Sequence, residues 1–154
     1  SKRGQYINLV TLIDDVITLY REEARNKNIL LSFQSNLDEA LILGSEAEVY
    51  HMIDLLIRNG ITQTLEGFVK VTLDVDNTYF VATISDSGLG IHPDKNYQIA
   101  HTDFKGRPCR VMHIQDSSTR LESIREMVQA HHGRLDIQIE PGIGAARRLW
   151  LPKF

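Results

Sequence analysis

The chain has 154 residues, a length that fits a single domain with one hydrophobic core. Its formal net charge of -3 argues against nucleic acid or an anionic membrane as a partner. No apolar run approaches the roughly 20 residues needed to cross a bilayer. We therefore expect no nucleic-acid partner and no direct membrane insertion of this domain. The single cysteine, Cys109, excludes an internal disulfide and is compatible with a cytoplasmic location.

Helical periodicity is the first signal along the chain. Residues 8–27 predict a helix, because Val10, Ile13 and Tyr20 recur at helical spacing and Asn8 is a plausible N-cap. Two short strands are expected after it, at residues 29–34 and 41–43.

A second helix is expected after residue 45. Ser45 is followed three residues later by Glu48, which forms a capping box. An apolar stripe then predicts a helix to about Gln63; its members are Val49, Met52, Ile53, Leu56 and Ile57. Residues 67–75 and 78–85 follow as two β-rich runs around Asp76-Asn77, which predicts a hairpin with a tight turn.

The second half of the chain begins with a segment that lacks periodicity. Residues 92–116 predict a long irregular connection, and connections of this length usually serve a function. A third helix is expected at 117–131, a strand at 135–139, a turn at 141–144 and a last strand at 148–151. The fold class is therefore an α/β (α+β) two-layer sandwich, with a mixed, mostly antiparallel sheet packed against about three helices.

A glycine loop after the central hairpin gives the most specific motif. Its residues are Asp86-Ser87-Gly88-Leu89-Gly90-Ile91, and the preceding helix carries Leu55-Leu56-Ile57-Arg58-Asn59-Gly60-Ile61-Thr62-Gln63-Thr64. Together with the order of elements, these motifs resemble the G1 and N boxes of the GHKL (Bergerat) fold, shared by histidine kinases, DNA gyrase B, Hsp90 and MutL. The histidine kinase ATP-binding (HATPase_c) domain is most similar. The resemblance covers residues 8–152 of one domain at 1–154, with 92–116 in the place of the ATP lid.

The resemblance implies a site for ATP and Mg²⁺. Asp86 matches the aspartate that accepts a hydrogen bond from the adenine amino group. Gly88 and Gly90, followed by Ile91, match the loop whose backbone approaches the base. Asn59 matches the asparagine that coordinates Mg²⁺, and an amide oxygen is a hard ligand that suits this ion.

Departures from the family pattern lie at the phosphate end. Leu55 and Thr62 replace an asparagine and a lysine of the N box, and Ala145 replaces a threonine. The G2 box, whose glycines cradle the phosphates at a helix N-terminus, is replaced by Asp116-Ser117-Ser118-Thr119-Arg120-Leu121. The hypothesis is therefore a domain impaired in ATP binding, with a regulatory or scaffolding role in a phosphorelay. The alternative is an active kinase domain with an unusual lid.

Histidine kinases transfer phosphate to a histidine on a separate dimerisation domain, so no catalytic residue is assigned within this chain. The expected partners are that histidine-bearing dimerisation domain, a receiver domain or a partner kinase. A gyrase-like or chaperone-like ATPase is a third reading. It is less favoured because those relatives use a catalytic glutamate in the N-box helix. Here Leu55 stands at the first asparagine position of the N box, and Glu48 lies too early and is better explained as a cap. The six histidines show no spacing typical of a metal site. This domain is expected to be cytoplasmic, alone or as part of a membrane-anchored protein.

Overall fold

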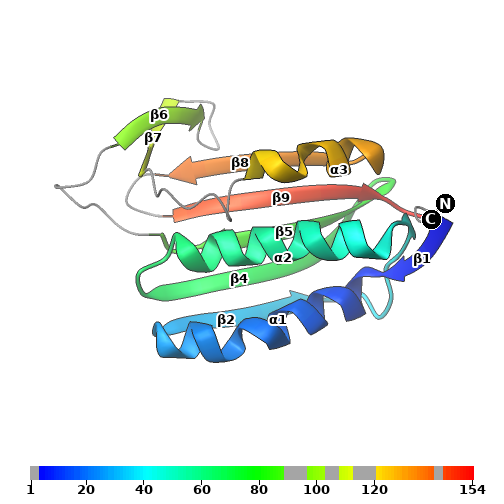
Figure 1. Cartoon of the computed structure of the whole chain (residues 1–154), viewed down its shortest axis with the longest axis horizontal. Coiled ribbons are helices and arrows are strands. Elements are labelled where there is room, and N and C mark those ends of the chain that lie inside the picture. Colours follow the sequence, from blue (N-terminus) through cyan, green and yellow to red (C-terminus); the bar gives the residue numbers. More distant parts are fainter. Residues whose placement is uncertain (1–3, 89–96, 103–107, 113–120, 141–143) are drawn as a thin grey trace.

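The computed structural model of the chain describes residues 4–88, 97–102, 108–112, 121–140 and 144–154. A five-stranded sheet forms one layer and the helices form the other (Figure 1). Along the sheet the strands are β2 (Ile29–Ser35), β4 (Gly67–Asp76), β5 (Tyr79–Asp86), β9 (Gly144–Pro152) and β8 (Arg134–Glu140). The β2–β4 pair is parallel and the other pairs are antiparallel. The predicted fold class is confirmed.

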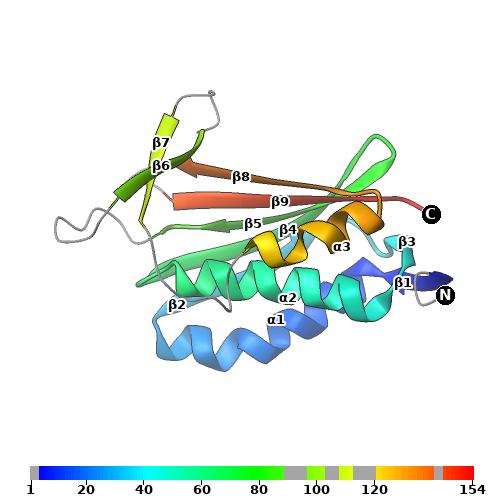
Figure 2. The ribbon, with the colours of Figure 1, turned by 45° about the horizontal axis from the view of Figure 1, so that its top comes forward.

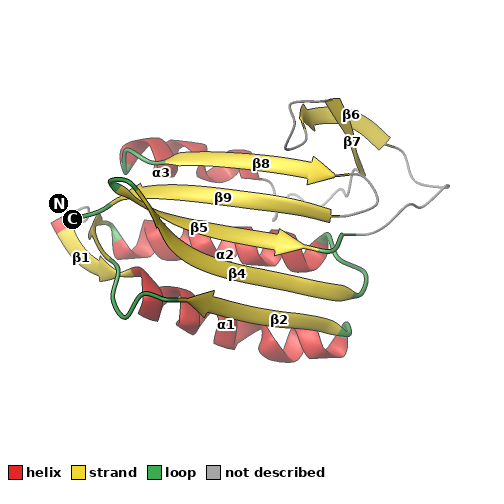
Figure 3. Cartoon of the chain, turned by 180° about the vertical axis from the view of Figure 1, so that it is seen from behind, coloured by secondary structure: helices red, strands yellow, loops and turns green. Residues whose placement is uncertain are grey.

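The helices α1 (Leu9–Asn26), α2 (Glu46–Thr62) and α3 (Arg125–Ala130) lie on one face of this sheet. Figure 2 separates the two layers, and Figure 3 shows from behind that the strands stand in front of all three helices. Alternate residues of the strands face the helices, as Val69, Val71 and Leu73 of β4 do, each fully buried. The hydrophobic core therefore fills the space between the two layers.

Capping residues begin the two long helices as predicted. The Asn8 side chain accepts a hydrogen bond from the Val10 backbone N–H at 3.1 Å. The Ser45 hydroxyl accepts one from the Glu48 N–H at 3.3 Å. Both caps satisfy N–H groups that have no partner inside the helix.

His131, which ends α3, links that helix to the start of α2. Its Nε2 accepts a hydrogen bond from the Ser45 N–H at 3.0 Å, while its Nδ1 lies 2.8 Å from the Met127 carbonyl oxygen. These contacts fix a ring that donates through Nδ1 and accepts through Nε2. The side chain is 6% exposed, so its removal would leave a buried donor unpaired.

Four sequence predictions about elements need correction. A short strand, β1 (Gln5–Asn8), was not predicted; it pairs with β3 (Leu41–Gly44). The segment 92–116 contains a hairpin of β6 (Tyr97–Thr102) and β7 (Pro108–Met112), where only an irregular connection was expected. The third helix begins with a 3-10 turn, η3 (Leu121–Ile124), and residues 117–120 of the prediction lie outside the described residues. The last strand starts at Gly144 rather than at residue 148.

The two ends of the described chain meet at one corner of the domain. The rings of Tyr6 and Phe154 are in edge-to-face contact with their centroids 4.7 Å apart, and both side chains are largely exposed. The Phe154 N–H donates to the Leu41 carbonyl at 3.0 Å, which holds the last residue against β3. This corner is at the end of the sheet where β9 finishes (Figure 1).

Candidate functional site

Asp86 is the last residue of β5, at the end of the sheet opposite the chain termini. The strand register pairs it with Ala145 of β9 and with Val69 of β4. Its side chain is on the same face as Phe80, Ala82 and Ile84, so it points toward the helices. Only 4% of the residue is exposed, and a carboxylate this deeply buried needs a partner.

Arg147 provides that partner from the neighbouring strand. It is opposite Ile84 in the β5–β9 register and therefore diagonal to Asp86. Its Nη1 donates to Oδ2 of Asp86 at 2.5 Å, and the two side chains are 3% and 1% exposed. The pair is thus a buried, charge-assisted hydrogen bond.

The same guanidinium also reaches α2. Nε of Arg147 donates to Oδ1 of Asn59 at 2.5 Å, and Asn59 is 8% exposed. One buried arginine therefore joins the residue predicted to bind adenine and the residue predicted to bind Mg²⁺. We call Asn59, Asp86 and Arg147 the buried triad.

Gly60 allows α2 to approach the sheet beside the buried triad. A Cβ added there would lie 3.3 Å from Cγ2 of Ile84 and 3.6 Å from Nη1 of Arg147. The first of these distances is shorter than ordinary van der Waals contact. The absence of a side chain at residue 60 thus brings the helix, and Asn59 with it, close to the guanidinium.

The carboxylate of Asp86 keeps one oxygen for another donor. Among the residues that the structure describes, its buried Oδ1 has no hydrogen-bond partner. An ionised carboxylate accepts through both oxygens, with room for about four hydrogen bonds. Chemically, the site can therefore accept an N–H donor such as an exocyclic amino group while Arg147 balances the charge.

Glycines let the loop after Asp86 pack against the start of β9. Gly88 has φ +74° and Gly144 has φ +145°, both in a region that side chains disfavour. A Cβ on Gly88 would lie 3.1 Å from the Gly144 Cα, and one on Gly144 would lie 1.9 Å from the Asp86 carbonyl oxygen. Gly88 thus has a structural reason to be glycine, in addition to the predicted approach to a base. Gly90 and Ile91 lie outside the described residues.

The substituted N-box positions have separate surroundings. Leu55 is 1% exposed and belongs to the core, so an asparagine there would need a buried partner. Thr62 is the half-buried last residue of α2. Of the G2-like segment, only Leu121 is described, as the first residue of η3. Sequence reasoning missed Arg147, although its spacing of two and four residues from Leu149 and Leu151 marks it as core-facing.

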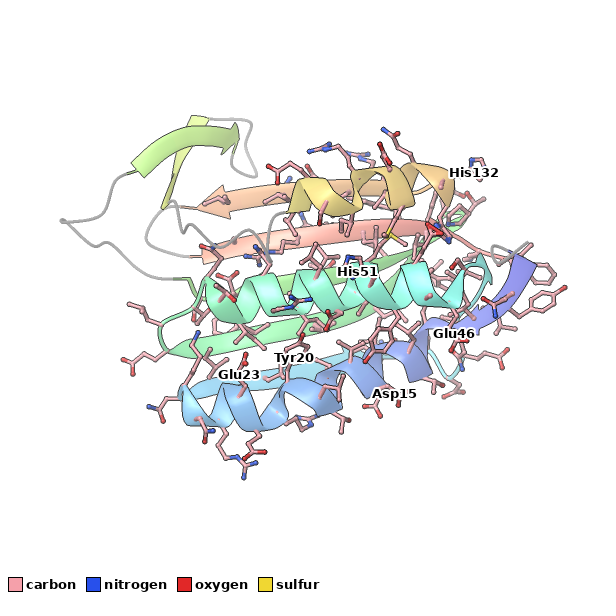
Figure 4. All side chains as sticks on the ribbon, viewed as in Figure 1. Asp15, Tyr20, Glu23, Glu46, His51 and His132 are labelled. Atoms are coloured by element: carbon pink, nitrogen blue, oxygen red, sulfur yellow. The ribbon has the colours of Figure 1, made fainter. Side chains whose placement is uncertain are left out.

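A second polar cluster, separate from the buried triad, joins α1 to α2. The Tyr20 hydroxyl donates to Oδ1 of Asp54 at 2.5 Å, and Arg58 forms an ion pair with Oδ2 of Asp54 at 2.6 Å. Burial, together with the hydrogen bond to Asp54, raises the pKa of Tyr20 to about 12. Figure 4 shows Tyr20 on α1, on the side toward α2. This cluster ties the two helices together.

Other kinds of site find no support in the described ranges. Within them, no group of three or more histidine, cysteine, aspartate or glutamate side chains is arranged to hold a metal ion. No described helix has both the length and the apolar composition to span a membrane. The buried triad and its glycine loops are therefore the candidate site.

Comparisons with known proteins agree on one family. Residues 44–154 match the family of histidine kinase-, DNA gyrase B- and HSP90-like ATPases. The chain is 26% identical over 144 residues to the sensor histidine kinase RppB of Synechocystis sp., covering 93% of this chain and 32% of RppB. It thus spans about a third of that relative.

Solved structures share the fold. The nucleotide-free catalytic domain of histidine kinase ThkA superposes with a TM-score of 0.74 at 20% identity, covering 97% of this chain and 95% of that domain. Full-length ShkA, solved in complex with AMPPNP, has a TM-score of 0.75 at 19% identity, covering 97% of this chain and 31% of ShkA. Both chains have the helix-and-sheet arrangement described above.

Proposed function

Because this chain belongs to the family of histidine kinase-, DNA gyrase B- and HSP90-like ATPases, we propose that it is the ATP-binding domain of a sensor histidine kinase and is impaired in binding ATP with Mg²⁺. One observation carries the proposal of impairment. The buried guanidinium of Arg147 occupies the amide oxygen of Asn59 and one carboxylate oxygen of Asp86. The two side chains that the family uses for metal and adenine are thus already engaged within the protein.

The sequence of the phosphate end supports the same proposal. Residues 116–121 read Asp-Ser-Ser-Thr-Arg-Leu and contain no glycine. A phosphate cradle at a helix N-terminus uses close backbone approach, which side chains obstruct. The N-box positions Leu55 and Thr62 also lack the amide and the ammonium group that the family has there. Phosphoryl transfer depends on positioning and charge neutralisation, so both affinity and rate should be low.

A domain of this kind acts through the proteins that it contacts. We infer a regulatory or scaffolding role within a two-component phosphorelay. Its expected partners are a histidine-bearing dimerisation domain, a receiver domain or a partner kinase. The sensor histidine kinase RppB, which matches 93% of this chain, is about three times its size, which supports further domains in the whole protein. Residues 92–116 keep their proposed place as the equivalent of the ATP lid.

Isothermal titration calorimetry with ATP and excess MgCl₂ tests the impairment on the full 154-residue chain. We expect binding weaker than micromolar, because Asn59 must first give up its hydrogen bond to Arg147 before its amide oxygen can bind Mg²⁺. An Asp86→Asn variant serves as the control for heat that arises outside the site. Micromolar binding at a stoichiometry of one would contradict the proposal.

An active kinase domain is the second candidate, and one observation favours it. Oδ1 of Asp86 has no partner among the described residues and is buried, so it can still accept the amino group of adenine. An autophosphorylation assay of the whole protein, with wild-type Asp86 and with Asp86→Asn, distinguishes the two candidates. Activity that Asp86→Asn abolishes supports the active kinase, whereas activity that is equal in both proteins argues against it.

A further inference from the structure

Arg147 places a permanent positive charge at the position where the family's metal ligand is found. We propose that the guanidinium of Arg147 takes the place of Mg²⁺ at Asn59, so that this site accepts an adenine nucleotide without a divalent metal. The inference rests on the proposed function in one respect, because it takes Asp86 to mark the adenine end of the site. It goes beyond that function by naming the metal-free nucleotide as the preferred ligand.

Nε of Arg147 lies too close to the amide oxygen of Asn59 for that oxygen to bind Mg²⁺ as well. Mg²⁺ binds oxygen at about 2.1 Å and tolerates little departure from octahedral geometry. Nε of Arg147 is 2.5 Å from Oδ1 of Asn59, so an ion on that oxygen would lie within about 4.6 Å of Nε. A dication and a guanidinium at this separation repel each other strongly in a site from which water is excluded. Asn59 in this arrangement does not fit a Mg²⁺ ligand.

The surroundings of Arg147 prevent a simple withdrawal of its side chain. The residue is 3% exposed, and β9 is hydrogen-bonded to β5 on one side and to β8 on the other. Its Nη1 is the only partner that the described residues give to the carboxylate of Asp86. If the guanidinium left, a buried carboxylate would remain without a counter-charge, which is strongly unfavourable. An arginine also stays charged at all relevant pH values.

Asp86 nevertheless keeps the chemistry that recognises a purine amino group. Arg147 uses Oδ2, and the buried Oδ1 has no hydrogen-bond partner among the described residues. The bound guanidinium holds the carboxylate in a fixed orientation, so that Oδ1 is already positioned to accept a hydrogen bond from a neutral N–H donor. The charge balance at Asp86 and Asn59 therefore suits a ligand that brings an amino group and no metal ion.

Binding of ADP to the wild-type chain in EDTA, compared with excess MgCl₂, tests the inference by calorimetry. We expect affinities that differ by less than about threefold, or a tighter complex in EDTA. Affinity that is about tenfold or more higher with MgCl₂ overturns the inference. If ADP binds in neither buffer, the inference is also overturned, while the proposed impairment still stands. Micromolar binding of ATP in excess MgCl₂, together with equally tight binding in EDTA, has the opposite meaning. The proposed impairment then fails, and the role of Arg147 holds.

Variants of two adjacent arginines on β9 locate the effect. Arg147→Met removes the charge beside Asn59, and we expect it to make ADP affinity at least about tenfold dependent on MgCl₂. Arg148→Met removes the same charge from the opposite face of the strand, where Arg148 donates to Gln138, and should bind ADP as the wild type does. Equal affinity of Arg147→Met in both buffers contradicts the inference. If this variant does not fold, the wild-type comparison remains decisive.

Discussion

Replacement of Arg147 by methionine should destabilise the domain strongly. Methionine has a similar length and no charge, so the main loss is the pair of hydrogen bonds to Asp86 and Asn59, each 2.5 Å long. Hydrogen bonds that involve a charged group contribute about 1.5–3 kcal/mol each. Breaking a buried ion pair from one side costs about 3–5 kcal/mol, because the remaining charge has no partner. The side chains of Asp86 and Arg147 are 1% and 3% exposed, so solvent screening reduces this figure little.

Urea unfolding followed by circular dichroism measures the loss directly. We expect Arg147→Met to lower the free energy of unfolding by about 3–5 kcal/mol, a large part of the 5–15 kcal/mol typical of a domain. The control is Arg148→Met, which removes half-buried contacts that include the hydrogen bond to Gln138 and should lose much less, about 1 kcal/mol.

A double variant then separates the charge from the packing. Adding Asp86→Asn to Arg147→Met removes the unpaired carboxylate, so the double variant should lose at least about 1 kcal/mol less than the two single losses added together. If Arg147→Met unfolds within about 1 kcal/mol of the wild type, the pair does not contribute as a buried ion pair and the reasoning is refuted.

Three further predictions concern other parts of the fold. His131→Ala leaves a buried N–H at the start of α2 without an acceptor, and we expect a loss of about 2–3 kcal/mol by urea unfolding. Because the pKa of Tyr20 is raised from 10 to about 12, the contribution of this group to stability is complete below pH 10 and is lost as the pH rises through 12. Replacement of Asp54 by asparagine should lower the pKa of Tyr20, measured by absorbance titration of tyrosinate. Gly144→Ala would place Cβ 1.9 Å from a carbonyl oxygen at φ +145°, so we expect a loss of more than about 3 kcal/mol or failure to fold, measured by thermal unfolding. Unchanged transitions in these variants would contradict each argument in turn.

Local sequence signals predicted the helical layer well. The capping residues Asn8 and Ser45 and the helical stripes after them depend on contacts within a few residues, and the observed α1 and α2 begin at the next residue in each case. The β4–β5 hairpin was also predicted, although its two turn residues are Asn77 and Thr78 rather than Asp76 and Asn77. Asn77 adopts φ +57°, which asparagine tolerates better than most residues.

Elements that depend on distant partners were not predictable in the same way. The strand Gln5–Asn8 exists because it pairs with Leu41–Gly44, more than 30 residues away, and four residues carry little periodicity of their own. The β6–β7 hairpin has mixed composition, and its strands are defined by pairing with each other.

Arg147 shows the limit of reading charge as exposure. Two adjacent arginines on a strand must point to opposite faces, so one of them has to face the core if Leu149 and Leu151 do. The alternation alone identifies which one, but the partner of a buried arginine comes from the register with β5 and from α2. Asp86 and Asn59 were both predicted as site residues; the contact that joins them required the tertiary structure.

The contact between Tyr6 and Phe154 places both ends of the described chain at one corner of the domain. In the β5–β9 register this corner is beside Tyr79 and Pro152, whereas Asp86 and Ala145 are seven residues further along the ladder. At about 3.3 Å per residue, roughly 23 Å of hydrogen-bonded sheet separates the ends from the buried triad. A fluorophore fused to either end would therefore lie far from the buried triad, whereas a reporter of the triad has to be placed near β6 and β7, at the end of the sheet where β9 begins (Figure 2).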